Sequence, residues 1–221
     1  MRPYRWFLHG VITLAPLVTS AQERSRLPDV SMTFKGDLVL PVSFNNPIFN
    51  SVTENIGQLG GTFQVPVYKG LGLGVGGNMT WYSIKERALS PVIISGDVQR
   101  IVGYGKLQYE QYTGDRTFYE LNARVGAAKF NFNCATCPSD GTTSFYWALG
   151  TGFFIHATDN LAFGLTVAYD ALNRRFAAAD LGLDNFPGRL EVEDQHDLRN
   201  LAFGLSFSTR FRRSERDVMS W

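Results

Sequence analysis

Several features that identify common protein classes are missing from this sequence. Its 221 residues carry 21 lysines and arginines against 20 acidic residues, so the formal net charge is only +1. That balance excludes a strongly basic nucleic-acid-binding protein, and we expect no nucleic-acid partner. No apolar run reaches the roughly 20 residues that a membrane-spanning helix needs, and the mean hydropathy is −0.10. The chain is therefore not a bundle of membrane helices.

Residues that carry catalytic or metal-binding chemistry are scarce. There are three histidines and two cysteines, and we find no phosphate-binding loop, no repeated metal-ligand spacing and no nucleophile elbow. His196 lies beside Glu193 and Asp194, but the surrounding stretch holds no serine to act as a nucleophile, and Ser144 has no obvious base. We therefore expect no enzymatic activity, no cofactor and no metal.

The first residues are typical of a secretory signal peptide. Met1–Arg5 holds two arginines, Trp6–Val18 is mostly apolar, and small residues lead up to Ala21 before a polar stretch. This order of charged region, apolar region and cleavage site predicts cleavage after Ala21. A short membrane anchor is the alternative, but thirteen residues are fewer than a spanning helix requires.

The two cysteines, Cys134 and Cys137, form a C-A-T-C pair that stays in the exported chain. Cysteines of exported proteins can oxidise. A redox motif would need a thioredoxin-like βαβ context, which is absent, and a metal site would need a second pair of ligands. We predict a local disulfide that ties a loop.

What the chain does contain is alternation with a period of two, along with 22 glycines and a 14% aromatic share. In Leu71–Ser83, for example, Leu71, Leu73 and Val75 alternate with glycines. Such alternation predicts β-strands with two different faces. Eight segments show it: Val30–Phe44, Gln58–Tyr68, Leu71–Ser83, Asp97–Gln111, Arg116–Phe130, Phe145–Ile155, Asn160–Asp170 and Asn200–Phe211.

The connections between these segments alternate in length. Three are tight turns, Tyr68–Gly70, Tyr112–Gly114 and Thr158–Asn160, and four are long and polar, at about 45–57, 85–96, 131–142 and 173–197. Residues that pair across two neighbouring strands lie on the same face of the sheet. The alternation of faces therefore requires an odd number of residues in each tight turn. A three-residue turn favours a left-handed last residue, so we expect that conformation at Gly70, Gly114 and Asn160.

The composition of the two faces indicates which one is inside. A soluble lipocalin-like barrel would put lysine, glutamate and threonine on its outer face, whereas here one face is mostly small and the other is an almost charge-free row of Leu, Phe, Val and Trp. Small residues suit the narrow lumen of an eight-stranded barrel, and the apolar row suits lipid. An exported chain without a spanning helix can enter a bilayer only as a closed barrel. We predict an all-β fold: an eight-stranded antiparallel up-and-down transmembrane β-barrel in the bacterial outer membrane.

This pattern resembles the small eight-stranded outer-membrane β-barrels of the OmpA/OmpX type, a porin-like family. The resemblance covers Val30 to Phe211 and rests on the strand pattern and the alternation of loops. The last strand is similar to the C-terminal assembly signal of such proteins, except that ten residues follow Phe211. The resemblance implies outer-membrane lipid and the barrel-assembly machinery as partners. It also implies a division of the chain into a signal peptide (1–21), a periplasmic segment (22–29), the barrel (30–211) and a C-terminal tail (212–221).

A group of charged residues falls on the inward face: Lys35, Asp37, Arg100, Lys106, Glu110, Arg116, Glu120 and Arg124. A three-residue turn at Tyr112–Gly114 would place Lys106 opposite Glu120, and Glu110 opposite Arg116. These charges could line an ion pathway, or they could pair into a plug. Because buried charges must be paired and a narrow lumen must be filled, the plug is the better interpretation.

Aromatic residues on the strands are expected to form two belts at the membrane interfaces. The predicted outer belt is Trp81, Tyr82, Phe145 and Trp147, and the predicted inner belt is Tyr68, Tyr109, Tyr112, Phe153 and Phe211.

The hexapeptide Asn-Leu-Ala-Phe-Gly-Leu occurs twice, at Asn160–Leu165 and Asn200–Leu205. We interpret it as one packing solution used on two strands. The copies are expected at opposite heights, without forming one symmetric motif.

The sequence favours a non-enzymatic outer-membrane protein with a structural or interaction role. Recognition would occur through surface loops, or the chain would be a subunit of a larger outer-membrane assembly with a protein partner. The apolar residues of the last long connection, Phe176, Leu181, Leu183 and Phe186, are the predicted contact residues. A small-solute channel is the main alternative, followed by a lipid-modifying enzyme and a soluble ligand-binding barrel.

Overall fold

The computed structural model describes residues 32–138, 141–187 and 197–211. In chain order the elements are β1 (Thr33–Ser43), α1 (Pro47–Val52), β2 (Thr53–Tyr68), β3 (Leu71–Ile84), α2 (Glu86–Leu89), β4 (Gly96–Tyr112), β5 (Thr117–Cys134), β6 (Thr142–His156), β7 (Leu161–Leu172), the 3₁₀ turn η1 (Ala178–Leu181) and β8 (Arg199–Arg210). No helix in these ranges is both long and apolar enough to cross a membrane. The predicted signal peptide, the 22–29 segment, the C-terminal tail and His196 lie outside the described residues.

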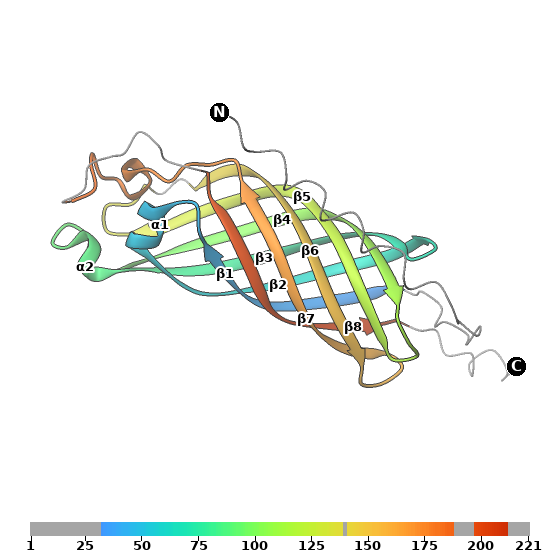
Figure 1. Cartoon of the computed structure of the whole chain (residues 1–221). Helices are drawn as coiled ribbons and strands as arrows, with labels where there is room; N and C mark the ends of the chain where they lie inside the picture. The colour runs from blue at the N-terminus through green and yellow to red at the C-terminus, as the bar shows by residue number, and fades with distance from the viewer. Residues whose placement is uncertain (1–31, 139–140, 188–196, 212–221) are drawn as a thin grey trace, which may run out of the picture.

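The strands close into a barrel (Figure 1). Each strand pairs with its neighbours in an antiparallel manner, and β1 completes the ring by pairing with β8 from Thr33↔Arg210 to Ser43↔Asn200. Closure leaves no free sheet edge, which is the condition for a β-structure in lipid. The predicted eight-stranded antiparallel barrel is confirmed.

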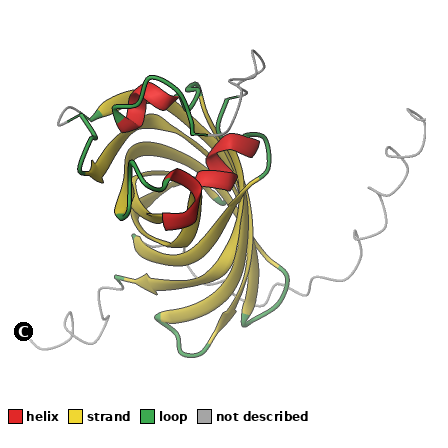
Figure 2. Cartoon of the chain, turned by 90° about the vertical axis from the view of Figure 1, so that its left-hand side faces the viewer, coloured by secondary structure: helices red, strands yellow, loops and turns green. Residues whose placement is uncertain are grey.

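The two ends of the barrel differ. At one end, which we call the turn end, short turns join β2 to β3, β4 to β5 and β6 to β7. At the other, the loop end, the long connections carry α1, α2 and η1. Figure 2 looks toward the loop end and shows the helices lying across the mouth. In outer-membrane barrels the short turns face the periplasm and the longer loops face outward.

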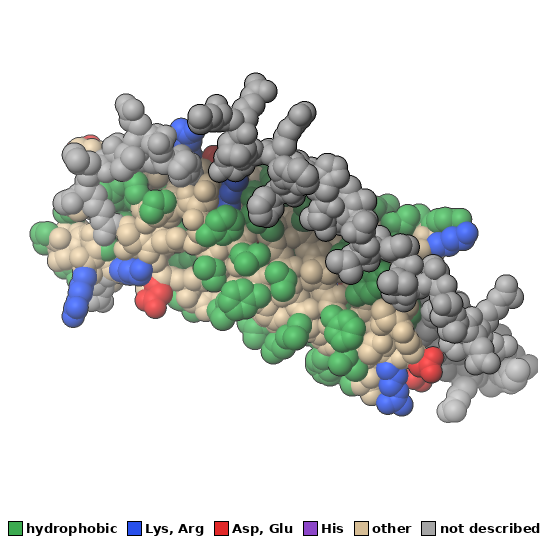
Figure 3. Space-filling view, viewed as in Figure 1, with side chains coloured by type: hydrophobic (Ala, Val, Ile, Leu, Met, Phe, Trp, Pro, Cys, Tyr) green, Lys and Arg blue, Asp and Glu red, His purple; other side chains and the backbone are tan. Residues whose placement is uncertain are grey.

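The barrel wall has an apolar exterior. Leu38, Leu73 and Leu165 are 58%, 55% and 66% exposed. Along each strand such exposed residues alternate with residues that point into the lumen. In Figure 3 apolar side chains cover the visible middle of the wall, and charged side chains gather toward its ends. Large apolar side chains at this exposure would be costly in water but are expected where the wall faces lipid. The predicted assignment of faces is confirmed.

Strand β2 begins at Thr53, five residues earlier than the predicted Gln58. The alternation is interrupted there because a bulge between Asn55 and Gly57 shifts the register by one residue. Ile56, the extra residue, is 63% exposed. A bulge moves the side chains on either side of it out of phase, so the period of two is lost in the sequence.

The tight turns differ from the prediction in detail. Between β4 and β5, Tyr112 pairs with Phe118, so the turn is longer than Tyr112–Gly114. The Thr113 N–H donates to the Thr117 carbonyl at 3.0 Å, and the two threonine hydroxyls lie 2.9 Å apart. These bonds close a wider turn and change the β4–β5 register.

Of the three turn residues expected to be left-handed, only Gly70 is, with φ of 86°. Lys69 precedes it with φ of 40°, so the β2–β3 connection is a two-residue turn between Tyr68 and Leu71, with a register shift at Pro66. The left-handed conformation was wrong for Gly114 and Asn160. The predicted register of β6 and β7 is nevertheless present, with His156 opposite Ala162.

The two copies of the repeated hexapeptide meet on neighbouring strands. Leu165 of the first copy lies directly opposite Leu205 of the second. The copies therefore extend from this pair in opposite directions and are related by a local two-fold axis. The expectation that they form no symmetric motif is wrong, because both end at the same paired position.

Glycine at position 126 has a packing role that glycine at 103 lacks. A Cβ on Gly126 would lie 2.0 Å from the Gly103 carbonyl oxygen, whereas a Cβ on Gly103 would meet nothing within 4 Å. We predict that Gly126→Ala lowers the free energy of unfolding by about 1–3 kcal/mol, since the clash is with backbone. The matched variant Gly103→Ala should change it by less than about 0.5 kcal/mol. Urea unfolding in detergent micelles measures both, and equal effects would contradict this account.

Candidate functional site

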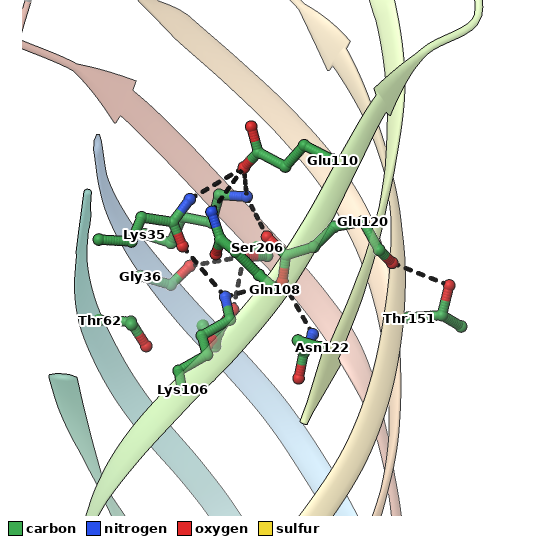
Figure 4. Close-up of polar contacts among 12 residues, drawn as sticks. Lys35, Gly36, Thr62, Lys106, Gln108, Glu110, Glu120, Asn122, Thr151 and Ser206 are labelled. Carbon is green, nitrogen blue, oxygen red and sulfur yellow. Dashed lines mark hydrogen bonds and ion pairs between the residues drawn. The ribbon is translucent and has the colours of Figure 1, made fainter. Parts of the chain in front are cut away.

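The lumen holds a buried ion cluster centred on Lys35 of β1 (Figure 4). The Lys35 Nζ lies 2.6 Å from Glu110 Oε1 and also contacts the Glu120 carboxylate. Lys106 of β4 reaches the same Glu120 at 2.7 Å. All four side chains are at most 5% exposed. Glu120 is thus shared between two cations that come from different parts of the wall.

Neutral amides complete this cluster. Gln64 Nε2 donates to Glu110 Oε1 at 2.9 Å, and Asn122 Nδ2 donates to Glu120 Oε1 at 2.8 Å. Lys106 in turn donates to Gln64 Oε1 at 3.2 Å. Figure 4 shows Lys35, Lys106, Glu110, Glu120 and Asn122 converging from several strands. Each of the two buried carboxylates thus accepts from more than one donor.

A second ion cluster lies closer to the loop end. Arg100 of β4 contacts Asp170 of β7 at 2.8 Å and donates to Gln58 Oε1 at the same distance. Asn200 of β8 also donates to Asp170, at 2.9 Å. The cluster therefore ties together strands from opposite sides of the ring. Between the two clusters, Arg124 and Asp37 approach to 4.0 Å.

The register that joins the charges differs from the predicted one. Lys106 lies opposite Arg124, and Glu110 lies opposite Glu120. Two carboxylates side by side would repel each other, but Lys35 comes across the lumen and contacts both. The sequence prediction considered partners on adjacent strands only and missed this contact.

Arg116 does not belong to the lumen, so its assignment there is wrong. It is exposed in the turn between β4 and β5, because that turn is longer than predicted. Asp170 was missing from the predicted charge group, although it falls on the inward face of its strand. Its partner Arg100 is on a strand three places away around the barrel, which the sequence does not reveal.

Aromatic side chains fill the rest of the lumen. At the turn end Phe118 and Phe154 stack with ring centroids 4.9 Å apart, and the Lys35 Nζ lies 4.7 Å from the Phe154 centroid. Tyr104 and Tyr146 form a layer between the two ion clusters, with centroids 6.1 Å apart. The Lys35 contact is a cation–π interaction, which adds to the stabilisation of a buried ammonium.

Two residues of the predicted aromatic belts face inward instead of toward lipid. Tyr82 is 3% and Tyr112 is 8% exposed. Other members, such as Phe145 at 53% and Tyr68 at 60%, are exposed on the wall. Tyr112 packs with Phe118 at the turn end, so these tyrosines fill the narrow lumen.

The packed lumen leaves little open space. In the described part of the lumen, four cations (Lys35, Arg100, Lys106, Arg124) pair with four anions (Asp37, Glu110, Glu120, Asp170), and Arg210 also lies over the Tyr112 and Phe118 rings at the turn end. The cavity bounded by Asp37, Arg124 and Asp170 has a volume of about 20 Å³. That is room for about one water molecule. The paired charges form a plug that leaves no wide aqueous path at this level.

The loop end is closed by an apolar cluster, which we call the cap. Its described buried members include Phe49, Val52, Leu89, Ile93, Phe176, Leu181, Phe186 and Leu198. The rings of Phe49 and Phe176 meet edge to face, with centroids 5.2 Å apart.

The predicted outer-loop contact residues belong to this cap and are not surface residues. Phe176, Leu181 and Phe186 are 1%, 0% and 2% exposed, and Leu183 packs against the same cluster. As a docking surface of the free loop, this assignment is wrong. An apolar loop segment can bury itself over the mouth of its own barrel, and that burial is favourable.

The structure contains the disulfide between Cys134 and Cys137. The enclosed Thr136 donates its hydroxyl to the Leu181 carbonyl at 2.8 Å. Gly182 follows with φ of 68°, and a Cβ there would lie 1.9 Å from the Thr136 carbonyl oxygen. The disulfide-bonded turn is thus docked closely on η1, which joins the third long connection to the fourth.

No group of three or more His, Cys, Asp or Glu residues within the described ranges is placed to hold a metal ion. His156 lies at the turn end beside Tyr112, with ring centroids 6.2 Å apart. Ser144 is buried near the opposite end. These two residues therefore do not form a nucleophile–base pair.

Comparison with known proteins gives a structural likeness only: no protein-family model and no curated protein matches the sequence. Neisserial surface protein A (NspA) has a similar structure, with 12% identity, a TM-score of 0.53, and coverage of 81% of this chain and 97% of NspA. Two further structures are less similar. Ail of Yersinia pestis has 13% identity and a TM-score of 0.46, covering 82% of this chain and 97% of its own. OprG of Pseudomonas aeruginosa has 13% identity and a TM-score of 0.44, covering 85% and 98%.

The chain has the fold of the small eight-stranded outer-membrane β-barrels. Because its strands close into a ring and its exterior is apolar, the barrel belongs in the bacterial outer membrane. Its interior combines an ion plug with an apolar cap.

We predict that Glu120→Gln strongly destabilises the barrel. The substitution leaves Lys35 and Lys106 buried with one carboxylate fewer, and breaking such a buried pair costs about 3–5 kcal/mol. Asp159→Asn, in the exposed β6–β7 turn, should change the free energy of unfolding by less than about 0.5 kcal/mol. Urea unfolding in lipid vesicles is the measurement, and a small effect of Glu120→Gln would show that the cluster is not a structural plug.

Ion conduction provides a separate test of the lumen. In a planar lipid bilayer the wild-type barrel should give no stable single-channel currents, because its lumen is filled by paired side chains. Stable currents that grow in Glu120→Ala would instead identify the cluster as a gate.

Proposed function

We propose that this barrel is a non-enzymatic outer-membrane protein whose loop end binds a protein partner. The observation that carries the proposal is the connection between β3 and β4, which includes α2 and lies at the tip of the loop end (Figure 1). Val92 is 48% and Ile94 is 68% exposed there. Exposed apolar side chains that lie close together at the outer end of a protein can mark a contact surface.

This connection is held in place by the cap. Ile93, between the exposed pair, and Leu89, three residues before Val92, are each 1% exposed. The Val92 and Ile93 N–H groups both donate to the Leu89 carbonyl, at 3.0 Å and 3.1 Å. A loop that is already ordered loses less conformational entropy when it binds a partner. This order favours a role for the exposed side chains in recognition.

The channel alternative has less support. Ion pairs occupy the lumen, aromatic rings fill the turn end, and the cap covers the loop end. A lipid-modifying enzyme would need a catalytic pair at the rim, and the described residues offer none.

The double variant Val92→Asn/Ile94→Asn should lose a co-purifying partner without unfolding. Barrel extracted from its native membrane in mild detergent is expected to migrate as a complex, and loss of the apolar pair should reduce the bound partner about tenfold or more. Thr143→Asn, an exposed position at the loop end of β6, serves as the matched control. Migration of the wild-type chain as a bare monomer, or retention of the partner by the double variant, would contradict the proposal.

A further inference from the structure

The disulfide-bonded turn lies between two of the outer connections. Cys134 is the last residue of β5, and it pairs with Gly96, the first residue of β4. A Cβ on Gly96 would lie 2.8 Å from the Asn133 carbonyl oxygen and 2.9 Å from the Cβ of Cys134. Gly96 follows the exposed Ile94 by two residues. The turn is therefore packed against the end of the connection that carries the proposed contact surface.

On its other side the turn holds η1. The Thr136 hydroxyl donates to the Leu181 carbonyl, and a Cβ on Gly182 would lie 1.9 Å from the Thr136 carbonyl oxygen. That approach leaves no space for a side chain at this position, and φ of 68° also favours glycine there. The backbone of the turn and the backbone at the end of η1 are thus in direct contact.

The two cysteines also pack against the cap. They are half-buried and contact its apolar cluster, to which Leu89 and Ile93 of the β3–β4 connection belong as well. Their neighbours in the turn, Ala135, Thr136 and Pro138, are exposed. The turn is thus open to a soluble thiol on one side and in contact with the cap on the other.

The disulfide restricts the conformations of this turn. It closes a loop of four residues, since the two cysteines are three positions apart. In the chain-entropy treatment, breaking the bond of so short a loop increases the number of accessible conformations about twentyfold. The Cys137 N–H still donates to the Cys134 carbonyl at 3.3 Å, which is long for such a bond and a weak constraint. A reduced turn is therefore free to carry Thr136 away from η1.

We propose that the Cys134–Cys137 disulfide is a redox-sensitive switch of the contact surface. In the oxidised state the turn holds η1 and the end of the β3–β4 connection together, so that Val92 and Ile94 are presented in one arrangement. Reduction by an external dithiol releases the turn from η1, loosens the cap around Ile93 and weakens partner binding. This inference rests on the proposed function, because it concerns the regulation of the same apolar pair.

The reduction is an ordinary thiol–disulfide exchange. A thiolate of the dithiol attacks one sulfur of the disulfide, the S–S bond breaks, and the other cysteine leaves as a thiolate that takes up a proton. The second thiol of the reductant then attacks the mixed disulfide, and the first cysteine leaves in the same way. The dithiol is oxidised to its own disulfide, and two electrons and two protons pass to the cysteines.

Amide hydrogen exchange of the folded full-length chain in detergent micelles tests the switch without a partner. One reporter is the Leu183 N–H, which donates to the Ala178 carbonyl, and the other is the Ile93 N–H, which donates to that of Leu89. Dithiothreitol should speed exchange about tenfold at Leu183 and about threefold at Ile93, which is further from the turn. The Thr113 N–H, at the opposite end of the barrel, should keep its rate.

Three variants separate the disulfide from other effects of the reductant. Cys134→Ser/Cys137→Ser should exchange rapidly from the start and should not respond to dithiothreitol. Thr136→Val keeps the disulfide but removes the hydroxyl that bonds to η1, so exchange at Leu183 should be fast in both redox states. Ala135→Ser, at an exposed position of the same turn, should behave as the wild type. Heat-modifiable gel migration shows which variants are folded, and the reduced wild type replaces the double serine variant if that one is not.

Partner binding provides the second measurement. In mild detergent the wild-type barrel should retain about tenfold less partner after dithiothreitol treatment and should recover it on reoxidation. The double serine variant should retain little partner under either condition, which shows that the effect arises in this chain and not in the partner.

Unchanged exchange at Leu183 after reduction, or an equal response of the double serine variant, would overturn the switch even if a partner binds. Faster exchange at Leu183 with an unchanged rate at Ile93 would overturn the control of the contact surface. A wild-type chain that migrates as a bare monomer would contradict the proposed function and with it the regulation of binding, while the exchange rates would still show whether the cap responds to reduction.

Discussion

Every other feature of this barrel depends on one requirement: backbone polar groups in a bilayer must be paired within the protein. Closing the sheet satisfies that requirement almost everywhere, and an eight-stranded ring leaves a lumen that side chains must fill. The chain fills it with opposed charges, and each buried carboxylate of the Lys35 cluster has more than one donor. The pairing of these charges is then a consequence of closure, since an unpaired ion at this depth would destabilise the fold.

The same requirement explains the two ends. At the turn end, hydrogen bonds between Thr113 and Thr117 set the β4–β5 register, and that register determines which charges meet. At the loop end, apolar side chains from three long connections fold inward over the mouth. The Cys134–Cys137 turn docks on η1 and fixes the last of them. The barrel thus presents an ordered outer surface, and its apolar cap continues into the lumen as far as Tyr104 and Tyr146.

Much of the fold follows from the sequence, because the period of two identifies both the strands and their faces. Lys106, Glu110 and Glu120 were placed in the lumen on that basis alone. What the sequence could not supply is contact across the ring: the partner of Lys35, and the pairing of Arg100 with Asp170, depend on closure. The apolar residues around Phe176 illustrate a second limit. A surface patch and a cap have the same composition, and only the position of the loop over the mouth distinguishes them.

The paired copies of Asn-Leu-Ala-Phe-Gly-Leu have a consequence for how the barrel meets the membrane. Because Leu165 and Leu205 lie opposite each other, one copy extends from this pair toward the turn end and the other extends toward the loop end. Measured outward from the pair, the two copies offer the same side chains in the same order, but their partners differ: Phe207 and Thr209 lie beside the first copy, and Val167 and Tyr169 lie beside the second. The repeat itself therefore gives the barrel no preferred direction across the membrane. The ends of the barrel do, because the long connections with their charged groups resist transfer across hydrocarbon, and the short turns do not reach far beyond it.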